Sequence, residues 1–312
     1  MLANKAAVTE SQRKKPRDKE KIAFIIFCTL IPVIQWLIFY VYTNFSSVIL
    51  AFKGSTGAFS LENFQRFFTE LQLESSEIRL AFRNTFLTFV IILISYPFKV
   101  LVSYFIYKKI PFAGLYRILF FLPSILFSVC TAMVFKQLVG VNGFIAQWVQ
   151  QWLGLEQVPE LLADSRFANT VVILHMLWLG FPGDLIIWGG TFARIPEELL
   201  EAGRIDGVNW WQEFTKITVP LVWPTLSLQM VLMICGIFGA SGANFLLTGG
   251  GHGTITFSTW TYLQTLNNSG TAYTSNVFNY MSAVGLMVTI VAVILSLSIR
   301  RITDKVFNDI DF

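Results

Sequence analysis

Six long apolar stretches constrain the fold of this 312-residue chain more than any other feature. A helix needs about 20 mostly apolar residues to cross the hydrocarbon core of a bilayer, and each stretch approaches that length. Charged residues make up 13% of the chain, against about 25% in a typical soluble domain. We therefore predict an all-α, polytopic membrane protein with six transmembrane helices, at about residues 22–42, 85–107, 118–135, 170–190, 221–247 and 278–299.

A basic, polar tail of residues 1–21 precedes the first apolar run. The alternative is a cleavable signal peptide, but the run from Ile22 to Tyr42 is longer than the apolar core of such a peptide. No small-residue cleavage site follows it cleanly. We expect residues 1–21 to be a cytoplasmic tail and residues 22–312 to form one transmembrane domain.

The Lys and Arg residues predict how the spans are oriented. Six spans place both termini on the same side of the membrane. In that arrangement sixteen basic residues lie on the side of the termini, six lie on the opposite side, and Lys99 lies within a span. Because cytoplasmic loops carry an excess of basic residues, both termini and the loop at residues 191–220 are predicted to be cytoplasmic.

The residues with reactive side chains argue against several classes of function. Cys28, Cys130 and Cys235 lie singly within apolar runs and are interpreted as reduced thiols. The chain has only two histidines, His175 and His252, so we predict no metal site and no catalytic residues, which argues against a membrane enzyme. It lacks a GxxxxGK[ST] phosphate-binding loop, so we expect no nucleotide cofactor here. We also predict no nucleic-acid partner, because such binding needs cations clustered on a folded face.

The loop at residues 191–220 carries its own helix signals between two apolar spans. Pro196 suits the first turn of a helix, and Gly207 fits the left-handed conformation that ends one. Asn209 with Gln212 three residues later matches a capping box for a second helix. We predict a helix–turn–helix at the membrane surface.

The same loop resembles the EAA loop of ABC-importer permeases. The family pattern is E-A-A, three residues, G, nine residues, I, one residue and L-P. This chain has Glu201-Ala202-Gly203, Gly207, Ile217 and Val219-Pro220 at those spacings. Gly203 replaces the second alanine and Val219 replaces the leucine. An ordinary amphipathic loop is the alternative, but chance rarely supplies this spacing together with the membrane context.

The resemblance implies a permease domain whose EAA-type coupling helix docks on an ATPase. In that family the glutamate that matches Glu201 contacts a basic residue of the ATPase. The implied coupling residues are Glu201, Ala202, Gly203, Asp206 and Gly207. Ala202 and Gly203 are small and would allow a close approach of the two proteins. The implied partners are a second homologous permease subunit, two cytoplasmic ATPase subunits that hold ATP and Mg²⁺, and an extracellular solute-binding protein. The implied location is a bacterial cell membrane.

Other segments resemble the carbohydrate-importing branch, the maltose-permease-like subunits. Asn63-Phe64 precedes the second span, Gly180-Phe181 lies in the fourth, and Thr248-Gly249-Gly250 follows the fifth. The chain departs from the family's T-x-G-G-P turn at Gly251-His252, where the family has proline. The resemblance implies a sugar or oligosaccharide as cargo.

In that branch the sugar contacts the middle of the fourth and fifth spans. The implied substrate residues are Leu179, Gly180, Gly183, Asp184, Met233, Gly236, Ile237 and Ala240. Asn244 is a further candidate, because its amide either hydrogen-bonds a sugar or is satisfied by packing within the protein. Asp184 stands out because a carboxylate within a membrane needs water, a donor or a cation. It either hydrogen-bonds sugar hydroxyls or pairs with Lys99, whose long side chain would otherwise extend toward the interface. The small residues of the fifth span fit close helix packing as well as a cavity wall.

Two other classes of transporter remain open. An ABC permease for another small solute, such as a polyamine or phosphate, would share the coupling loop. An ion-coupled secondary transporter would need ion-coupling residues, for which Asp184 and Lys99 are the candidates. That class would leave the EAA-like loop unexplained.

Overall fold

The computed structural model describes residues 18–239, 242–268 and 274–306, and the regular elements within these ranges are helices. Six of the described helices are long and apolar enough to cross a membrane, which confirms the all-α, six-span prediction. They comprise Lys21–Ala51, Glu77–Tyr107, Ser128–Leu153, Ala168–Phe192, Trp210–Gly236 and Asn276–Lys305.

Several of these spans are built from more than one helical segment. In chain order the elements are α2 (Asp18–Trp36), the π-helix η2 (Leu37–Tyr42), α3 (Thr43–Ala51), α4 (Glu62–Gln72), α5 (Glu77–Tyr107), α6 (Ala113–Ile125), α7 (Ser128–Val139), α8 (Phe144–Leu153), α9 (Ala168–Phe192), α10 (Glu197–Ile205), α11 (Trp210–Gln212), the π-helix η3 (Glu213–Thr218), α12 (Val219–Gly236), α13 (Gly242–Thr248), α14 (Phe257–Asn268) and α15 (Thr274–Val306).

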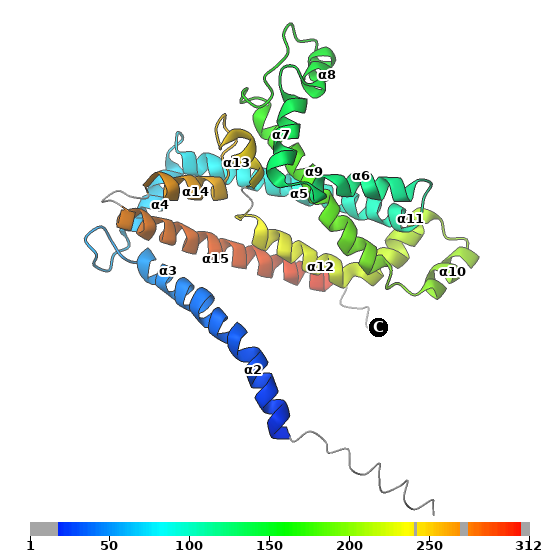
Figure 1. Ribbon diagram of the computed structural model, residues 1–312, viewed down its shortest axis with the longest axis horizontal. Helices are drawn as coiled ribbons and strands as arrows, with labels where there is room; N and C mark the ends of the chain where they lie inside the picture. Colours follow the sequence, from blue (N-terminus) through cyan, green and yellow to red (C-terminus); the bar gives the residue numbers. More distant parts are fainter. Residues whose placement is uncertain (1–17, 240–241, 269–273, 307–312) are drawn as a thin grey trace, which may run out of the picture.

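The body of the molecule is built on α5, α9, α12 and α15. Helix α5 packs along α9, α12 packs along α15, and α14 lies against both α5 and α15 (Figure 1). Helices α10 and α11 lie at one end of this body, whereas α4 and α14 lie at the other (Figure 1). Helix α3 packs on α15, and α2 leads away from the body. The loop between the fourth and fifth spans is therefore held at one end of the helix bundle.

Two stretches that hydropathy predicts as continuous spans are broken in the structure. The stretch at 118–135 begins in α6 and ends in α7, because the backbone is extended at Leu126 and Phe127. Both residues are apolar, so hydropathy does not reveal the break. The stretch at 221–247 is also divided. Its helix is continuous from Trp210 and ends at Gly236, near further glycines that are poor helix formers, and α13 follows as a separate element.

The segment that follows α13, at residues 249–268, packs into the body of the molecule. Thr254, Thr259 and Trp260 are buried, and the segment forms α14. Asn84 of α5 fixes it by donating from Nδ2 to the carbonyl oxygens of Gly253 at 2.7 Å and of Ile255 at 2.9 Å. This segment, rich in Gly, Thr and Ser, is thus anchored to a helix that lies more than 160 residues earlier in the chain.

The Asn63-Phe64 pair closes the connection between α3 and α4. Asn63 is buried, and its Nδ2 donates to the carbonyl oxygens of Ala51 at 3.1 Å and of Lys53 at 3.0 Å. The Phe64 ring lies 5.1 Å from that of Phe52. The Asn63 side chain therefore satisfies backbone carbonyl oxygens at the end of the first span, where the helix supplies no further N–H donors.

Candidate coupling loop and membrane pocket

The loop at 191–220 folds as predicted, through local signals. Helix α10 ends before Gly207, which has a φ of 74°. The side-chain oxygen of Asn209 then accepts from the Gln212 backbone N–H at 2.9 Å, and the Gln212 side chain accepts from the Asn209 N–H at 3.1 Å. This capping box starts α11, and the helix–turn–helix is confirmed.

One face of α10 is open to solvent and carries most of the predicted coupling residues. Glu201, Ala202, Asp206 and Gly207 are exposed. Ile205 lies among them with an exposed fraction of 87%. These side chains are not covered by the rest of the described chain, so this face of α10 is open to a partner.

Gly203 differs from the other residues of this set, because it is buried within the chain. A Cβ atom at this position would stand 2.7 Å from Cδ1 of Ile217 in η3. In the structure Gly203 therefore faces η3 rather than solvent. Its missing side chain makes room for Ile217, the isoleucine of the same sequence pattern, and brings α10 close to η3.

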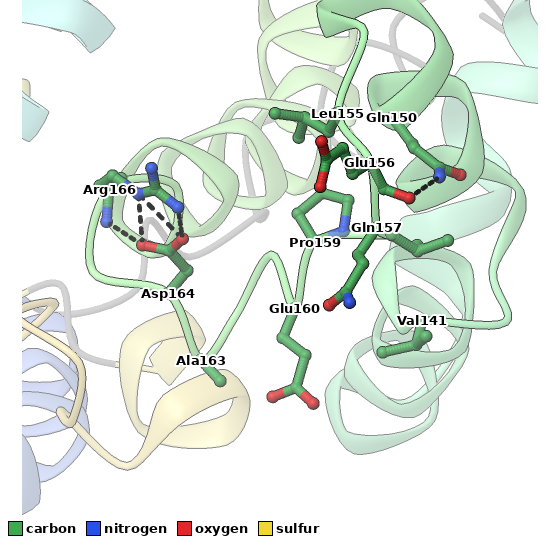
Figure 2. A pocket seen from close by; sticks show the side chains of 11 residues that line it. Val141, Gln150, Leu155, Glu156, Gln157, Pro159, Glu160, Ala163, Asp164 and Arg166 are labelled. Atoms are coloured by element: carbon green, nitrogen blue, oxygen red, sulfur yellow. Dashed lines mark hydrogen bonds and ion pairs between the residues drawn. The ribbon is translucent and has the colours of Figure 1, made fainter.

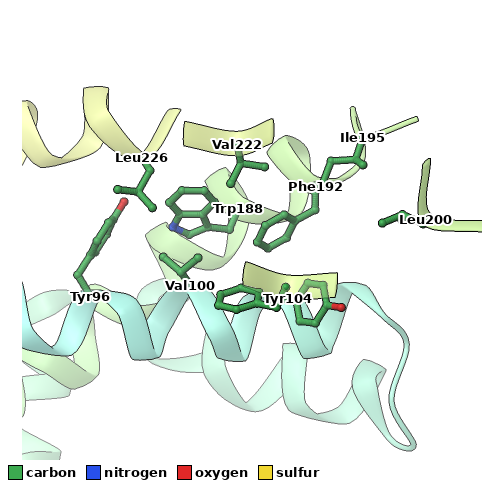
Figure 3. Close-up of a cluster of buried hydrophobic side chains, with 10 residues drawn as sticks. Tyr96, Val100, Tyr104, Trp188, Phe192, Ile195, Leu200, Val222 and Leu226 are labelled. Atoms are coloured by element: carbon green, nitrogen blue, oxygen red, sulfur yellow. The ribbon is translucent and has the colours of Figure 1, made fainter. Parts of the chain in front are cut away.

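The other side of the loop is sealed to the spans by an apolar cluster. Ile195 and Leu200 of the loop are buried together with Tyr104 of α5, Phe192 of α9 and Val222 of α12 (Figure 3). Burying a large apolar side chain contributes about 1.5–3 kcal/mol, so this contact holds the loop firmly. Through this cluster the loop is in contact with three spans.

Asp184, the predicted substrate residue of α9, forms an ion pair with Lys99 of α5. Nζ of Lys99 lies 2.9 Å from Oδ2 of Asp184, and the exposed fractions of the two side chains are 7% and 19%. Lys99 passes over Gly180, where a Cβ atom would stand 3.3 Å from Nζ. The structure thus supports the pairing alternative, and the Lys99 side chain does not extend to the interface.

Three predicted substrate residues of the fifth span line a pocket of about 200 Å³. They are Met233 and Gly236 of α12 and Ile237, the residue after it. The pocket is completed by α5, α9 and the segment before α14, through Thr85, Thr88, Phe89, Ile92, Met176 and Thr256. Its volume is below the range of about 300–1,000 Å³ that is usual for small-molecule sites. In this conformation the chain by itself encloses only part of such a site.

The remaining predicted substrate residues lie apart from this pocket. Asp184 is eight residues beyond the pocket residue Met176 on α9, about 12 Å along a helix. Leu179, Gly180 and Gly183 share this region of α9, and Gly183 has open space where a Cβ atom would stand. Asn244 is buried in α13, where its Nδ2 donates to the Thr254 carbonyl oxygen at 2.6 Å, so it holds a turn. Ala240 lies outside the described residues.

A wider hollow of about 1,000 Å³ lies on the segment between α8 and α9 (Figure 2). Its walls carry the carboxylates of Glu156 and Glu160, and Arg166 binds Asp164 with an N–O distance of 2.6 Å. Hydrogen bonds from Arg166 hold the pKa of the Asp164 carboxyl below its usual range. The hollow is open to solvent, and its walls mix polar and apolar side chains. Within the described ranges no group of three or more His, Cys, Asp or Glu side chains could hold a metal ion.

One buried polar group of the loop has no sequence signal. Glu213, the first residue of η3, is 5% exposed and lies against Tyr104 and Lys108 of α5. From the sequence, a glutamate in a loop with many charged residues is expected to face solvent. The tyrosine and lysine that contact it lie more than 100 residues earlier in the chain. Only the packing of η3 on α5 reveals the contact.

A six-span helical membrane protein with an exposed helix–turn–helix between its fourth and fifth spans has the architecture of the membrane component of a transporter. Residues 76–308 match the model of the family described as binding-protein-dependent transport system inner membrane component. The chain belongs to this family, whose members are transport components.

The curated relatives include sugar permeases. The chain is 29% identical over 183 residues to the probable ABC transporter permease protein YurN of Bacillus subtilis, covering 58% of this chain and 61% of the relative. It is 24% identical over 283 residues to the multiple sugar-binding transport system permease protein MsmF of Streptococcus mutans, covering 88% and 93%. It is 32% identical over 139 residues to the maltose/maltodextrin permease MalF of Vibrio parahaemolyticus, covering 44% and 26%. The chain thus spans less than two thirds of YurN and of MalF.

A solved structure has the same fold. It is the crystal structure of a bacterial ABC transporter involved in the import of the acidic polysaccharide alginate. The TM-score is 0.75 at 20% identity, and the match covers 92% of this chain and 98% of the other. A second structure, of a bacterial alginate ABC transporter in complex with a periplasmic protein that carries an alginate pentasaccharide, gives a TM-score of 0.74 at 22% identity, covering 93% and 99%.

Proposed function

We propose that this chain is the membrane-spanning permease subunit of an ATP-driven ABC importer that translocates a sugar or oligosaccharide delivered by an extracellular binding protein. The observation that carries the proposal is the exposed face of α10, with Glu201, Ala202 and Ile205, in a family of binding-protein-dependent transport components. The names of MsmF and MalF support a sugar as the cargo rather than a polyamine or phosphate.

The proposed assembly contains a second homologous permease subunit, two ATPase subunits and the binding protein. ATP and Mg²⁺ belong to the ATPase, and this chain carries no cofactor. Helix α10 seats in a groove of the ATPase, with Glu201 paired to a basic group there. A charge-assisted hydrogen bond is directional, so nucleotide-driven closure pulls α10 along a fixed path. The apolar cluster of Leu200 and Tyr104 passes that displacement to the spans.

The proposed sugar path runs along α5, α9 and α12. Met233, Gly236 and Ile237 offer apolar surface for a sugar face, and the hydroxyl-bearing Thr85 and Thr88 lie in the same wall. The second permease subunit supplies the opposite wall and enlarges the pocket to the size of a sugar ring. Leu179, Gly180 and Gly183 line the continuation of the path along α9.

The docking surface is tested by reversing charge on α10. Glu201→Lys is expected to weaken capture of the ATPase by a few kcal/mol, about 100-fold in affinity or more, because repulsion replaces a paired contact. Gly207→Asp should also weaken capture, because a side chain at a φ of 74° strains the turn that positions α10. The measurement is co-purification of the ATPase with the tagged chain, together with MgATP hydrolysis by the complex. Glu156→Lys makes the same charge change at an exposed position of the segment between α8 and α9 and should leave capture unchanged. Normal capture by both α10 variants would remove the coupling role.

The proposed orientation places both termini and α10 in the cytoplasm, and α14 near the outer surface. Asp206→Cys and Asn267→Cys put single thiols at exposed positions of these two regions, in a background without the native cysteines. A membrane-impermeant maleimide added to intact cells should label the Asn267→Cys variant and not the Asp206→Cys variant. Both should be labelled after the cells are permeabilised. The reverse pattern in intact cells contradicts the orientation.

A further inference from the structure

Glu213 is a buried carboxylate on the side of the loop that packs against the spans. Its Oε1 accepts a hydrogen bond from Oη of Tyr104 at 3.0 Å, and it forms an ion pair with Nζ of Lys108. Only 7% of its side chain is exposed. A buried carboxylate costs several kcal/mol unless it is paired and hydrogen-bonded, so this geometry fixes where η3 can sit.

Both partners of Glu213 belong to one helix end. Tyr104 and Lys108 are four residues apart at the end of α5 and therefore face the same side. Around them the contacts are aromatic. The Tyr104 ring lies 5.1 Å from that of Phe214, and the Phe105 ring lies 5.3 Å from that of Trp210. Aromatic faces can slide past each other, whereas a hydrogen-bonded ion pair has one geometry.

The contact occupies the middle of a continuous series that begins at the exposed helix. Gly203 and Ile217 join α10 to η3, and Glu213 joins η3 to α5. Five residues before Tyr104 on the same helix, Lys99 joins α5 to Asp184 of α9. That step is about 7.5 Å along the helix. Each join uses a close or charged contact, and η3 itself is a π-helix, a form that is frequent at functional sites.

We propose that Glu213 is a positioning residue that makes α5 move with the coupling loop. The inference rests on the proposed function, in which α10 docks on an ATPase. When nucleotide binding displaces α10, Glu213 carries the end of α5 along through Tyr104 and Lys108. Without this link the loop moves on the ATPase while α5 lags behind, and hydrolysis is uncoupled from opening of the sugar path.

The chain contains a matched control at its opposite end. Glu70 of α4 accepts a hydrogen bond from Oη of Tyr280 and pairs with Arg66, whose Nε lies 2.8 Å from Oε1. This cluster has the same three kinds of group as the Glu213 cluster, including a cation over the tyrosine ring. It ties α4 to α15, far from α10 (Figure 1). A purely structural role for such a cluster should therefore appear equally at Glu70.

The test measures movement rather than transport. Spin labels on Glu197→Cys and Asp304→Cys report the loop against α15, and labels on Lys109→Cys and Asp304→Cys report the end of α5 against α15; all three positions are exposed. The distances are compared in the purified permease–ATPase complex with ADP and with MgATP plus vanadate. In the otherwise unmodified complex both distances should change. In Glu213→Gln the loop distance should still change, whereas the α5 change should fall to about half or less of its original size.

Two further variants keep the test decisive. Tyr104→Phe removes only the hydrogen bond and keeps the aromatic packing, so it should show the same dissociation of the two distances even if Glu213→Gln yields little protein. Glu70→Gln should leave both changes intact. If the distance from the end of α5 to α15 changes fully in Glu213→Gln or in Tyr104→Phe, the inference is overturned and the proposed function stands. The same holds if Glu70→Gln reduces that change equally. A loop distance that does not change in the unmodified complex overturns the proposed function and the inference with it.

Discussion

Replacing Asp184 by asparagine is expected to lower the yield of folded protein sharply. The change leaves the Lys99 ammonium, 7% exposed, without its counter-charge at 2.9 Å inside a membrane span. Removing one partner of a buried ion pair typically costs about 3–5 kcal/mol, and the partial exposure of Asp184 places the expected loss near the lower end. Yield in detergent and the midpoint of thermal unfolding, followed by fluorescence-detected size exclusion, measure the effect.

The same experiment separates the two roles considered for Asp184. On the pairing account Lys99→Met restores the yield of Asp184→Asn, because the stranded charge is gone. Asp304→Asn removes the acid of an exposed pair with Arg300, at 3.8 Å, and should change the unfolding midpoint little. An Asp184→Asn variant with normal yield and an altered sugar preference would show instead that the carboxylate contacts the cargo.

The second large effect is expected from Gly143→Ala, at the turn between α7 and α8. A Cβ atom there would stand 2.2 Å from the carbonyl oxygen of Leu138 and 2.3 Å from that of Gln137. These are backbone atoms at the end of α7, so they cannot move aside as a flexible side chain would. The end of α7 must unwind or α8 must shift, and overpacking of this kind costs about 1–3 kcal/mol or more.

A lower midpoint of thermal unfolding and faster proteolysis near residues 140–156 are the expected signs. Gly114→Ala is the matched control, because no atom lies within 4 Å of the position of its Cβ and alanine favours the helix. An unfolding midpoint for Gly143→Ala equal to that of Gly114→Ala would contradict the close approach of the two helices.

Under the proposed function, a second subunit completes the pocket formed by α5, α9 and α12. The volume of about 200 Å³ beside Met233 and Gly236 is too small for an oligosaccharide. Gly183 has open space beside it on α9, and Gly236 has the same on α12. Under the proposed function these open faces are where the second subunit closes the sugar path, and the movement of α5 sets its width.

The predictions that the structure confirms depend on residues that are close together in the sequence. Hydropathy over about 20 residues is enough to identify a membrane helix, because lipid must be faced by apolar side chains along the whole span. The helix–turn–helix followed from Gly207 and from the Asn209–Gln212 capping box, whose groups lie within a few residues of one another. The break at Leu126 was invisible, because an apolar residue in an extended turn leaves hydropathy unchanged.

By itself the sequence determined the all-α class, the six spans, the loop between the fourth and fifth spans and the resemblance to the family. Only the tertiary structure decided which groups meet across the chain. In the structure Asp184 pairs with Lys99 and Glu213 is buried against Tyr104. Gly203 packs on Ile217, and the Asn244 side chain stabilises a turn. Such contacts depend on how helices distant in sequence are placed side by side, and burial forces each polar group to find whichever partner that placement brings near.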